Sequence, residues 1–123
     1  MAERGILKPI VRNPSGIGGW ASFTVPGRVQ TGSDIAYPIV IAAGVLIDHM
    51  QAVVNVAPTG ASMQGQLLRD GSPWGDVFTI PAGDTDSGSF APGAQDSNQH
   101  TYTLQVTQVG STEPGRDLTV YIF

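Results

Sequence analysis

Apolar and polar residues alternate with a period of two in several short segments, which is the pattern of strands that bury one face. The clearest segment, residues 101–109, is predicted to turn Tyr102, Leu104 and Val106 toward the core and its threonines and glutamines toward water. Two further segments show the same alternation, with inward residues Leu118, Val120 and Ile122 in the last strand, and Ala21, Phe23 and Val25 after Trp20. Pro26-Gly27 is predicted to turn the chain after the strand that contains Ala21, Phe23 and Val25.

Two further strands are predicted between residues 37 and 56. Residues 37–41 form one, and Pro38 restricts it to a sheet edge or to the start of a strand. Residues 45–56 form the longest candidate, interrupted by Asp48-His49, which indicates a bulge or an exchange between sheets. Its predicted inner face consists of Met50, Ala52, Val54 and Val56.

A hairpin is predicted for the middle of the chain. Residues 62–69 and 76–80 flank Asp70-Gly71, and Asp-Gly between two apolar segments is a strong turn signal. The following stretch, residues 84–99, is rich in Gly, Ser and Asp, and is predicted to be a mobile loop around one brief strand at Phe90.

Composition agrees with this pattern. The chain has 12 Val, 9 Ile and 10 Thr, and branched side chains favour strands. Its 16 Gly and 9 Pro leave no window long enough for an uninterrupted helix. The predicted fold class is all-β, a two-sheet antiparallel sandwich of jelly-roll type with an extended N-terminal arm, divided into an arm (1–19) and a sandwich domain (20–123).

Charge is unevenly distributed. Residues 1–28 carry four cations, Arg4, Lys8, Arg12 and Arg28, against one carboxylate, whereas residues 29–123 carry two cations against nine carboxylates. A basic arm rich in Pro and Gly is predicted to dock on an acidic neighbour such as another copy of this protein, although chance in a short window would give the same pattern. The predicted partner-binding residues of the arm are Arg4, Lys8, Pro9 and Arg12.

Several function classes are disfavoured. An acidic body with a single lysine argues against nucleic-acid binding, which needs clustered cations. The longest apolar run, residues 37–47, is too short to span a bilayer, so no membrane partner is expected. The absence of cysteine excludes disulfides and thiolate chemistry, and no nucleophile elbow or phosphate-binding loop occurs. We expect no enzymatic activity and no cofactor. The N-terminus lacks the apolar stretch of a signal peptide, which favours residence in a cytoplasm or in a particle assembled there.

Weak candidate sites remain. Asp84 and Asp86 precede a glycine as in calcium loops, but the third ligand and the bidentate glutamate of such a loop are missing, so a solvated turn is the favoured interpretation. His49 and His100 would have to meet in space to hold a metal ion. His49 beside Asp48 is predicted to be either a titratable interface spot or a hydrogen-bonded structural histidine.

Aromatic residues are the candidate ligand platforms, namely Trp20, Tyr37, Trp74 and Tyr121. Trp74 is the main candidate, because an exposed indole in the 70–75 turn would stack on a sugar or insert into a neighbouring subunit. The alternative is an indole that folds back over the edge of the sandwich.

The order of turn motifs from Val54 onward resembles that of β-sandwich modules in virion proteins of tailed bacteriophages. An apolar strand ends in Pro58-Thr-Gly-Ala61, a turn reads Ile80-Pro-Ala-Gly83, and Val109-Gly-Ser-Thr-Glu-Pro-Gly115 precedes the last strand. The resemblance covers a little over half of the chain, and its motifs mark turns of a sandwich rather than a chemical site.

This resemblance implies a non-enzymatic virion structural protein. A small sandwich with an arm is similar to a capsid decoration, or cement, protein on the capsid surface, assembled in the host cytoplasm, with the arm clamping neighbouring subunits. The implied partners are the major capsid protein and other copies of this chain, in a homo-oligomer (trimer or dimer). The alternative is a tail- or fibre-associated module that binds a receptor or carbohydrate through Trp74 and residues 84–99.

Overall fold

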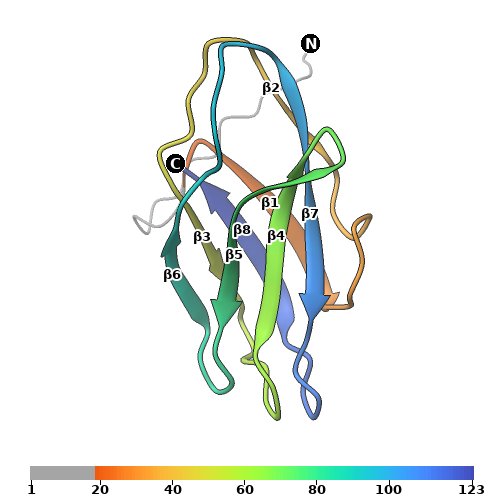
Figure 1. Cartoon of the computed structure of the whole chain (residues 1–123). Coiled ribbons are helices and arrows are strands. Elements are labelled where there is room, and N and C mark those ends of the chain that lie inside the picture. The colour runs from red at the N-terminus through yellow and green to blue at the C-terminus, as the bar shows by residue number, and fades with distance from the viewer. Residues whose placement is uncertain (1–18) are drawn as a thin grey trace, which may run out of the picture.

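Two antiparallel sheets of four strands each pack face to face in the computed structural model, which describes residues 19–123 (Figure 1). This part of the chain contains no helix, and therefore none long and apolar enough to cross a membrane. The strands are β1 (Ala21–Arg28), β2 (Ile39–Ile41), β3 (Met50–Val53), β4 (Met63–Arg69), β5 (Ser72–Ile80), β6 (Asp86–Phe90), β7 (His100–Gln108) and β8 (Arg116–Ile122). The predicted all-β sandwich is confirmed.

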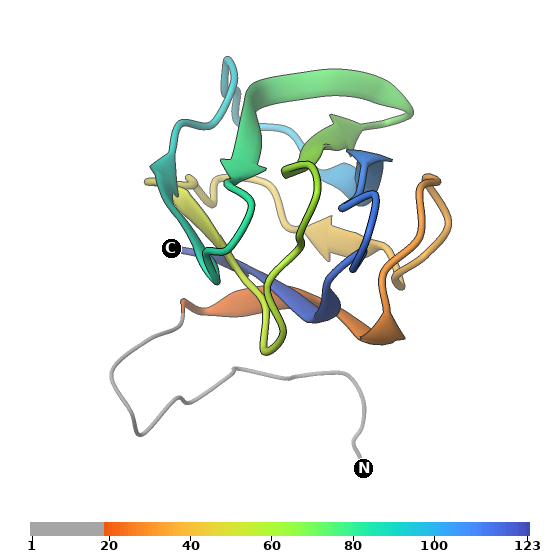
Figure 2. The same cartoon turned by 90° about the horizontal axis from the view of Figure 1, so that it is seen from below.

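The strand order places sequence-distant strands side by side. One sheet has the order β1-β8-β3-β6 and the other β2-β7-β4-β5. The first strand pairs with the last, the second with the seventh, the third with the sixth, and the fourth with the fifth, all antiparallel. Viewed from below, the two sheets enclose the core between them (Figure 2). The edge strands are β1 and β6 in one sheet and β2 and β5 in the other.

The core consists of the inward faces of both sheets. Alternation along β7 and β8 is as predicted, because every one of their predicted inward residues is buried. The rings of Phe78 on β5 and Phe90 on β6 lie with centroids 5.4 Å apart and join the two sheets. The largest fully buried side chains include Phe23, Phe78, Met50, Met63, Leu67, Ile80, Leu104, Leu118 and Ile122.

The predicted hairpin joins β4 to β5 through a two-residue turn. Arg69 pairs with Ser72, so Asp70 and Gly71 are the two central residues. Both have positive φ, 52° at Asp70 and 88° at Gly71, as a type I′ turn requires. Since β5 begins at Ser72, it is four residues longer than predicted and takes in Trp74.

The predicted turn at Pro26-Gly27 is wrong. Strand β1 continues to Arg28, and its pairing with β8 shifts register between Val25 and Arg28, which is a bulge. Gly27 takes the positive φ of 73°, and its N–H donates to Asp117 Oδ1 at 2.7 Å. An edge strand tolerates the proline because one of its sides has no ladder to interrupt.

The strand predicted over residues 45–56 is shorter in the structure, where β3 covers only Met50–Val53. Ile47 is held instead by a glutamine side chain: its N–H donates to Gln95 Oε1 at 2.6 Å, and Gln95 Nε2 donates to the Ile47 carbonyl at 2.7 Å. His49 lies just before β3 rather than in mid-strand. Val56, predicted to face inward, is 40% exposed.

Candidate functional site

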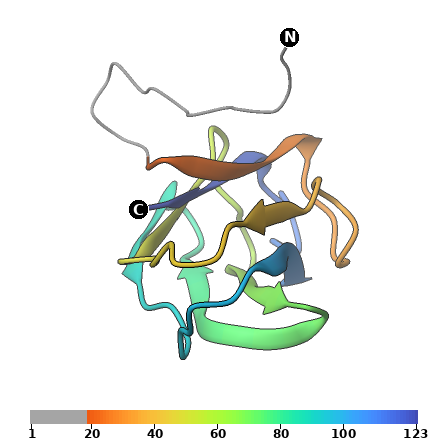
Figure 3. The ribbon, with the colours of Figure 1, turned by 90° about the horizontal axis from the view of Figure 1, so that it is seen from above.

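A groove opens on the side of the sandwich between the edge strands β1 and β2. The chain contacts β7 twice on its way from β1 to β2, where Gly32 bridges Val106 and Ile39 pairs with Tyr102. Between these contacts six residues, 33–38, span the length of three residues of β7. The connection therefore bows away from β7 (Figure 3), and Thr103 of β7 is one of the residues that line the opening.

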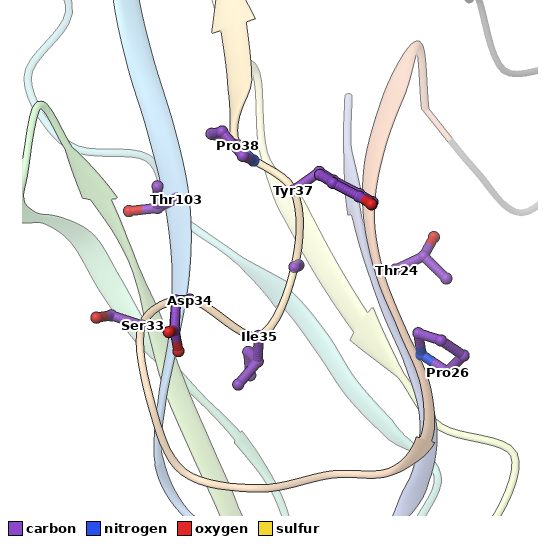
Figure 4. A pocket seen from close by; sticks show the side chains of 9 residues that line it. Thr24, Pro26, Ser33, Asp34, Ile35, Tyr37, Pro38 and Thr103 are labelled. Atoms are coloured by element: carbon purple, nitrogen blue, oxygen red, sulfur yellow. The ribbon is translucent and has the colours of Figure 1, made fainter.

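The groove has a volume of about 600 Å³ and mixed walls. Ile35 and Ala36 form its apolar side and pack against the core, while Ser33 and Asp34 contribute a hydroxyl and a carboxylate. The facing wall comes from Thr24 and Pro26 of β1. Figure 4 shows the side chain of Tyr37 extending from the connection toward β1.

Exposed apolar side chains follow one another along the chain from the groove through β2 and into the connection after it. Tyr37 is 92% exposed, Val40 on β2 is 59% exposed, and Leu46 is 65% exposed. Together with Val45 they fall within ten consecutive residues, 37–46, which we call the apolar segment. Of these four side chains, that of Tyr37 lines the groove. An exposed aromatic side chain in the lining of a groove is typical of a surface that binds another molecule.

Trp74 does not form an exposed platform, and this correction removes the main candidate. It lies on β5 and is 6% exposed. Its Nε1 donates to the Ala94 carbonyl at 2.7 Å, and its ring meets the Tyr102 ring edge-on with centroids 5.0 Å apart. A β-carbon on Gly93 would come within 2.6 Å of the indole, so the chain at residues 93–94 lies tightly over it. The indole folds back onto the sandwich, as the alternative interpretation has it.

A histidine between two carboxylates ties three segments together at one end of the molecule. His100 Nδ1 lies 2.6 Å from Asp70 Oδ2 in the β4–β5 turn, and Nε2 lies 2.8 Å from Asp96 Oδ1 in the β6–β7 loop. The second Asp70 oxygen accepts from the Thr101 N–H at 3.0 Å. Only 16% of the His100 side chain is exposed. No local residue pattern marks this cluster, because its members come from three separate segments of the chain.

The hydrogen bonds of this cluster favour the charged forms of all three side chains. Hydrogen bonds to the carboxylates of Asp70 and then of Asp96 raise the pKa of His100, whereas desolvation and, last, the charge of Arg69 oppose this rise. Hydrogen bonds from the Thr101 N–H and from His100 lower the pKa of Asp70, and those from the Asn98 N–H and His100 lower that of Asp96. A neutral imidazole has only one N–H, so both contacts are complete only when His100 is protonated.

We therefore expect His100 to stabilise the fold in weakly acidic solution. The contribution of a raised histidine pKa is fully present below the ordinary value of 6.5 and is lost as the pH rises through the raised value. The contribution of the two carboxyls is present above 3.8 and lost as the pH falls through their lowered values. Urea unfolding should show His100→Gln losing more stability at pH 5 than at pH 9. Gln99→Ala, an exposed neighbour, is the control, and an equal loss at both pH values would contradict the assignment.

Asp84 and Asp86 do not assemble a metal centre with other residues. Asp86 opens β6, and its two carboxylate oxygens accept from Gln51 Nε2, each at 2.9 Å, while Oδ1 also accepts from the Gly88 N–H. Asp84 is exposed in the turn before β6. Across residues 19–123 no group of three or more His, Asp or Glu side chains is placed to hold a metal ion.

The other singled-out residues are dispersed. His49 contacts Asp48 at 2.8 Å and stacks on Phe123 with ring centroids 4.3 Å apart. Neither of these residues is a partner of His100, which contacts Asp70 and Asp96. Tyr121 lies beside the same Phe123 ring, and Trp20 packs against the core. The predicted arm residues Arg4, Lys8, Pro9 and Arg12 lie outside the described residues.

The groove was accessible to sequence analysis only in part. Tyr37 was a candidate platform, and Pro38 correctly marked the beginning of an edge strand. The groove opens because the connection has six residues where the facing stretch of β7 has three. No sequence signal predicts this difference, because it depends on where the chain returns to β7. No family model matches the chain, and neither the curated proteins nor the solved structures yielded a match.

Proposed function

We propose that the chain is a non-enzymatic structural protein of a tailed-bacteriophage virion, and specifically a capsid decoration protein. The observation that carries this proposal is the groove between β1 and β2, which exposed Tyr37 lines and from which the apolar segment continues along the chain. Exposed apolar side chains such as Tyr37 and Leu46 are stabilised when a protein partner covers them. The sequence resemblance supplies the class of particle.

The strand order supports the jelly-roll type that the proposal requires. A jelly roll arises when a ribbon of antiparallel strand pairs wraps around a core, which pairs the first strand with the last and each inner strand with its counterpart. The pairs β1–β8, β2–β7, β3–β6 and β4–β5 follow this rule. Jelly rolls are frequent among viral capsid domains and among lectins, so this topology is compatible with both candidate functions, a capsid protein and a carbohydrate-binding module.

The Asp70–His100–Asp96 cluster supports a structural rather than a catalytic role. Both ring nitrogens of His100 are engaged by carboxylates that belong to two different loops. An imidazole held on both sides has no free nitrogen to accept a proton from a substrate. Its geometry serves to hold the 91–99 segment against the β4–β5 turn.

Co-sedimentation with undecorated capsids tests the proposal. The protein should saturate capsids at a fixed stoichiometry, and Tyr37→Ser should weaken binding about tenfold or more, because buried interface tyrosines often contribute over 1 kcal/mol. Val77→Ser is the matched control, since Val77 is 53% exposed on β5, the opposite edge of the same sheet as β2. A protein that stays in the supernatant at every concentration would contradict the proposal.

A tail- or fibre-associated carbohydrate-binding module is the second candidate. The observation that favours it is again Tyr37, an exposed aromatic residue that lines the groove together with Asp34, Ser33 and Thr103. Aromatic faces with adjacent hydrogen-bonding groups suit sugars. Glycan-array binding that Tyr37→Ser abolishes, together with indifference to capsids, would favour this candidate.

A further inference from the structure

We infer that the groove between β1 and β2 binds residues 6–11 of the N-terminal segment of a second copy of this chain. The inference deepens the proposed function, because it names the surface on which the arm docks. The groove, its charge and its position relative to the start of β1 each contribute to the argument.

The shape of the groove suits an extended peptide. It is lined by Thr24 and Pro26 of the edge strand β1, by the 33–38 connection that leads into the edge strand β2, and by Thr103 of β7, so it lies open on the side of the sandwich where the two sheets meet. Residues 6–11 read Ile-Leu-Lys-Pro-Ile-Val, which supplies four apolar side chains for Ile35, Ala36 and Tyr37 to contact. Proline restricts φ to an extended value, which lowers the entropy that Pro9 loses on binding.

Charge favours the same pairing. Residues 19–123 carry three arginines against nine carboxylates, whereas residues 1–18 carry Arg4, Lys8 and Arg12 against Glu3 alone. Asp34 lines the groove and is exposed. A peptide with apolar side chains and flanking cations is therefore attracted to this acidic body.

The start of β1 favours a second copy over the same copy. Gly19 is packed against the end of β8, since a β-carbon there would lie 1.6 Å from the Ile122 carbonyl oxygen, and the Trp20 N–H donates to that oxygen at 3.0 Å. This junction lies beside the C-terminus, and β1 runs from it toward the 29–38 connection (Figure 1). To enter its own groove the segment would have to reverse direction fully. A neighbour's groove requires no reversal.

The length of the segment is sufficient for this exchange. Eighteen extended residues reach about 60 Å, whereas a domain of this size has a radius of gyration of about 13 Å. Exchange of identical segments between copies closes into a dimer or a ring, according to the rotation that relates the copies.

Disulfide trapping tests the inference directly, because the chain contains no cysteine. Full-length Ile10→Cys, tagged to change its mass, is mixed with full-length Tyr37→Cys, oxidised, and analysed on non-reducing gels. The mixed dimer should form at least ten times more than with Val77→Cys, whose side chain is also exposed but lies on β5. Repetition with Ile6→Cys covers a shift in register. Equal trapping at positions 37 and 77 would overturn the inference.

The same experiment separates the two possible origins of the segment. A double variant, Ile10→Cys with Tyr37→Cys, should form linked oligomers at low protein concentration. Linkage within one chain alone would overturn the assignment to a second copy.

A charge variant gives an independent readout. Thr24→Arg adds a cation to the exposed groove wall and should raise the dissociation constant of the oligomer at least tenfold in analytical ultracentrifugation. Thr79→Arg makes the same change on β5, also at an exposed threonine, and should leave it unaltered. An unchanged dissociation constant for Thr24→Arg would overturn the inference.

The outcome is distinguishable from that of the capsid experiment. Trapping at position 37 without capsid binding would overturn the proposed function and leave the exchange of segments standing. Capsid binding by a protein that shows no selective trapping would overturn only the exchange.

Discussion

Replacing Trp74 by alanine should lower the free energy of unfolding by about 3–5 kcal/mol, the range for a large aromatic side chain removed from a core. The indole is 6% exposed, contacts Tyr102, and lies under Gly93. Its removal also deprives the Ala94 carbonyl of one of two donors, the other being Arg69 Nη1 at 2.7 Å. Urea denaturation monitored by circular dichroism measures the loss.

The Trp74→Phe variant separates packing from hydrogen bonding. It keeps an aromatic ring and loses the Nε1–H donor, so its own cost should include about 1 kcal/mol for the hydrogen bond and remain well below that of alanine. If Trp74→Ala unfolded at the same urea concentration as the unmodified protein, the indole would not be packed as the structure places it.

The second large effect is expected at Leu104. Leu104→Ala should cost about 2–5 kcal/mol, because it removes a side chain that is 0% exposed in the middle of β7 and leaves a cavity between the sheets. The change in unfolding free energy from chemical denaturation provides the measurement.

Leu46→Ala is the matched control, since it makes the same chemical change at a leucine that is 65% exposed. Its effect should be within about 0.5 kcal/mol of zero, as for surface substitutions in general. Similar losses for the two leucines would contradict the inward face assigned to β7.

The first of these effects concerns a side chain that holds residues 91–99, and the second concerns the core between the two sheets. The predicted loop is fastened by Arg69, Trp74 and His100 on one side and by Gln95 on the other. These side chains come from three strands and from the loop itself. Polar contacts therefore attach this loop, which has few apolar side chains, to strands β4, β5 and β7 and to Ile47 in the apolar run of residues 37–47.

Strand prediction succeeded where a single face is buried. The alternation of β7 and β8 and the Asp70-Gly71 turn were evident from residue type, because each depends on neighbours in the sequence. It failed at Pro26-Gly27 and at residues 45–48. In both places the backbone is stabilised by a distant side chain, Asp117 for Gly27 and Gln95 for Ile47.

For the candidate site, too, residue types were evident from the sequence, whereas features that depend on distant parts of the chain were not. The sequence identified Tyr37 as an aromatic residue of interest but assigned the main role to Trp74, since a tryptophan in a turn next to Gly and Pro is compatible with either exposure or burial. Burial was decided by residues 93–94, which lie about twenty positions later in the chain. The Asp70–His100–Asp96 cluster was likewise invisible, because Asp70 and His100 are 30 positions apart.

The sequence by itself determined the fold class, most strand positions and the inward faces of β7 and β8, because these depend on local alternation and turn chemistry. The tertiary structure decided the pairing order, the burial of Trp74, the histidine cluster and the groove. Each of these depends on the return of the chain to strands that are far away in sequence, and local residue patterns carry no information on where that return occurs.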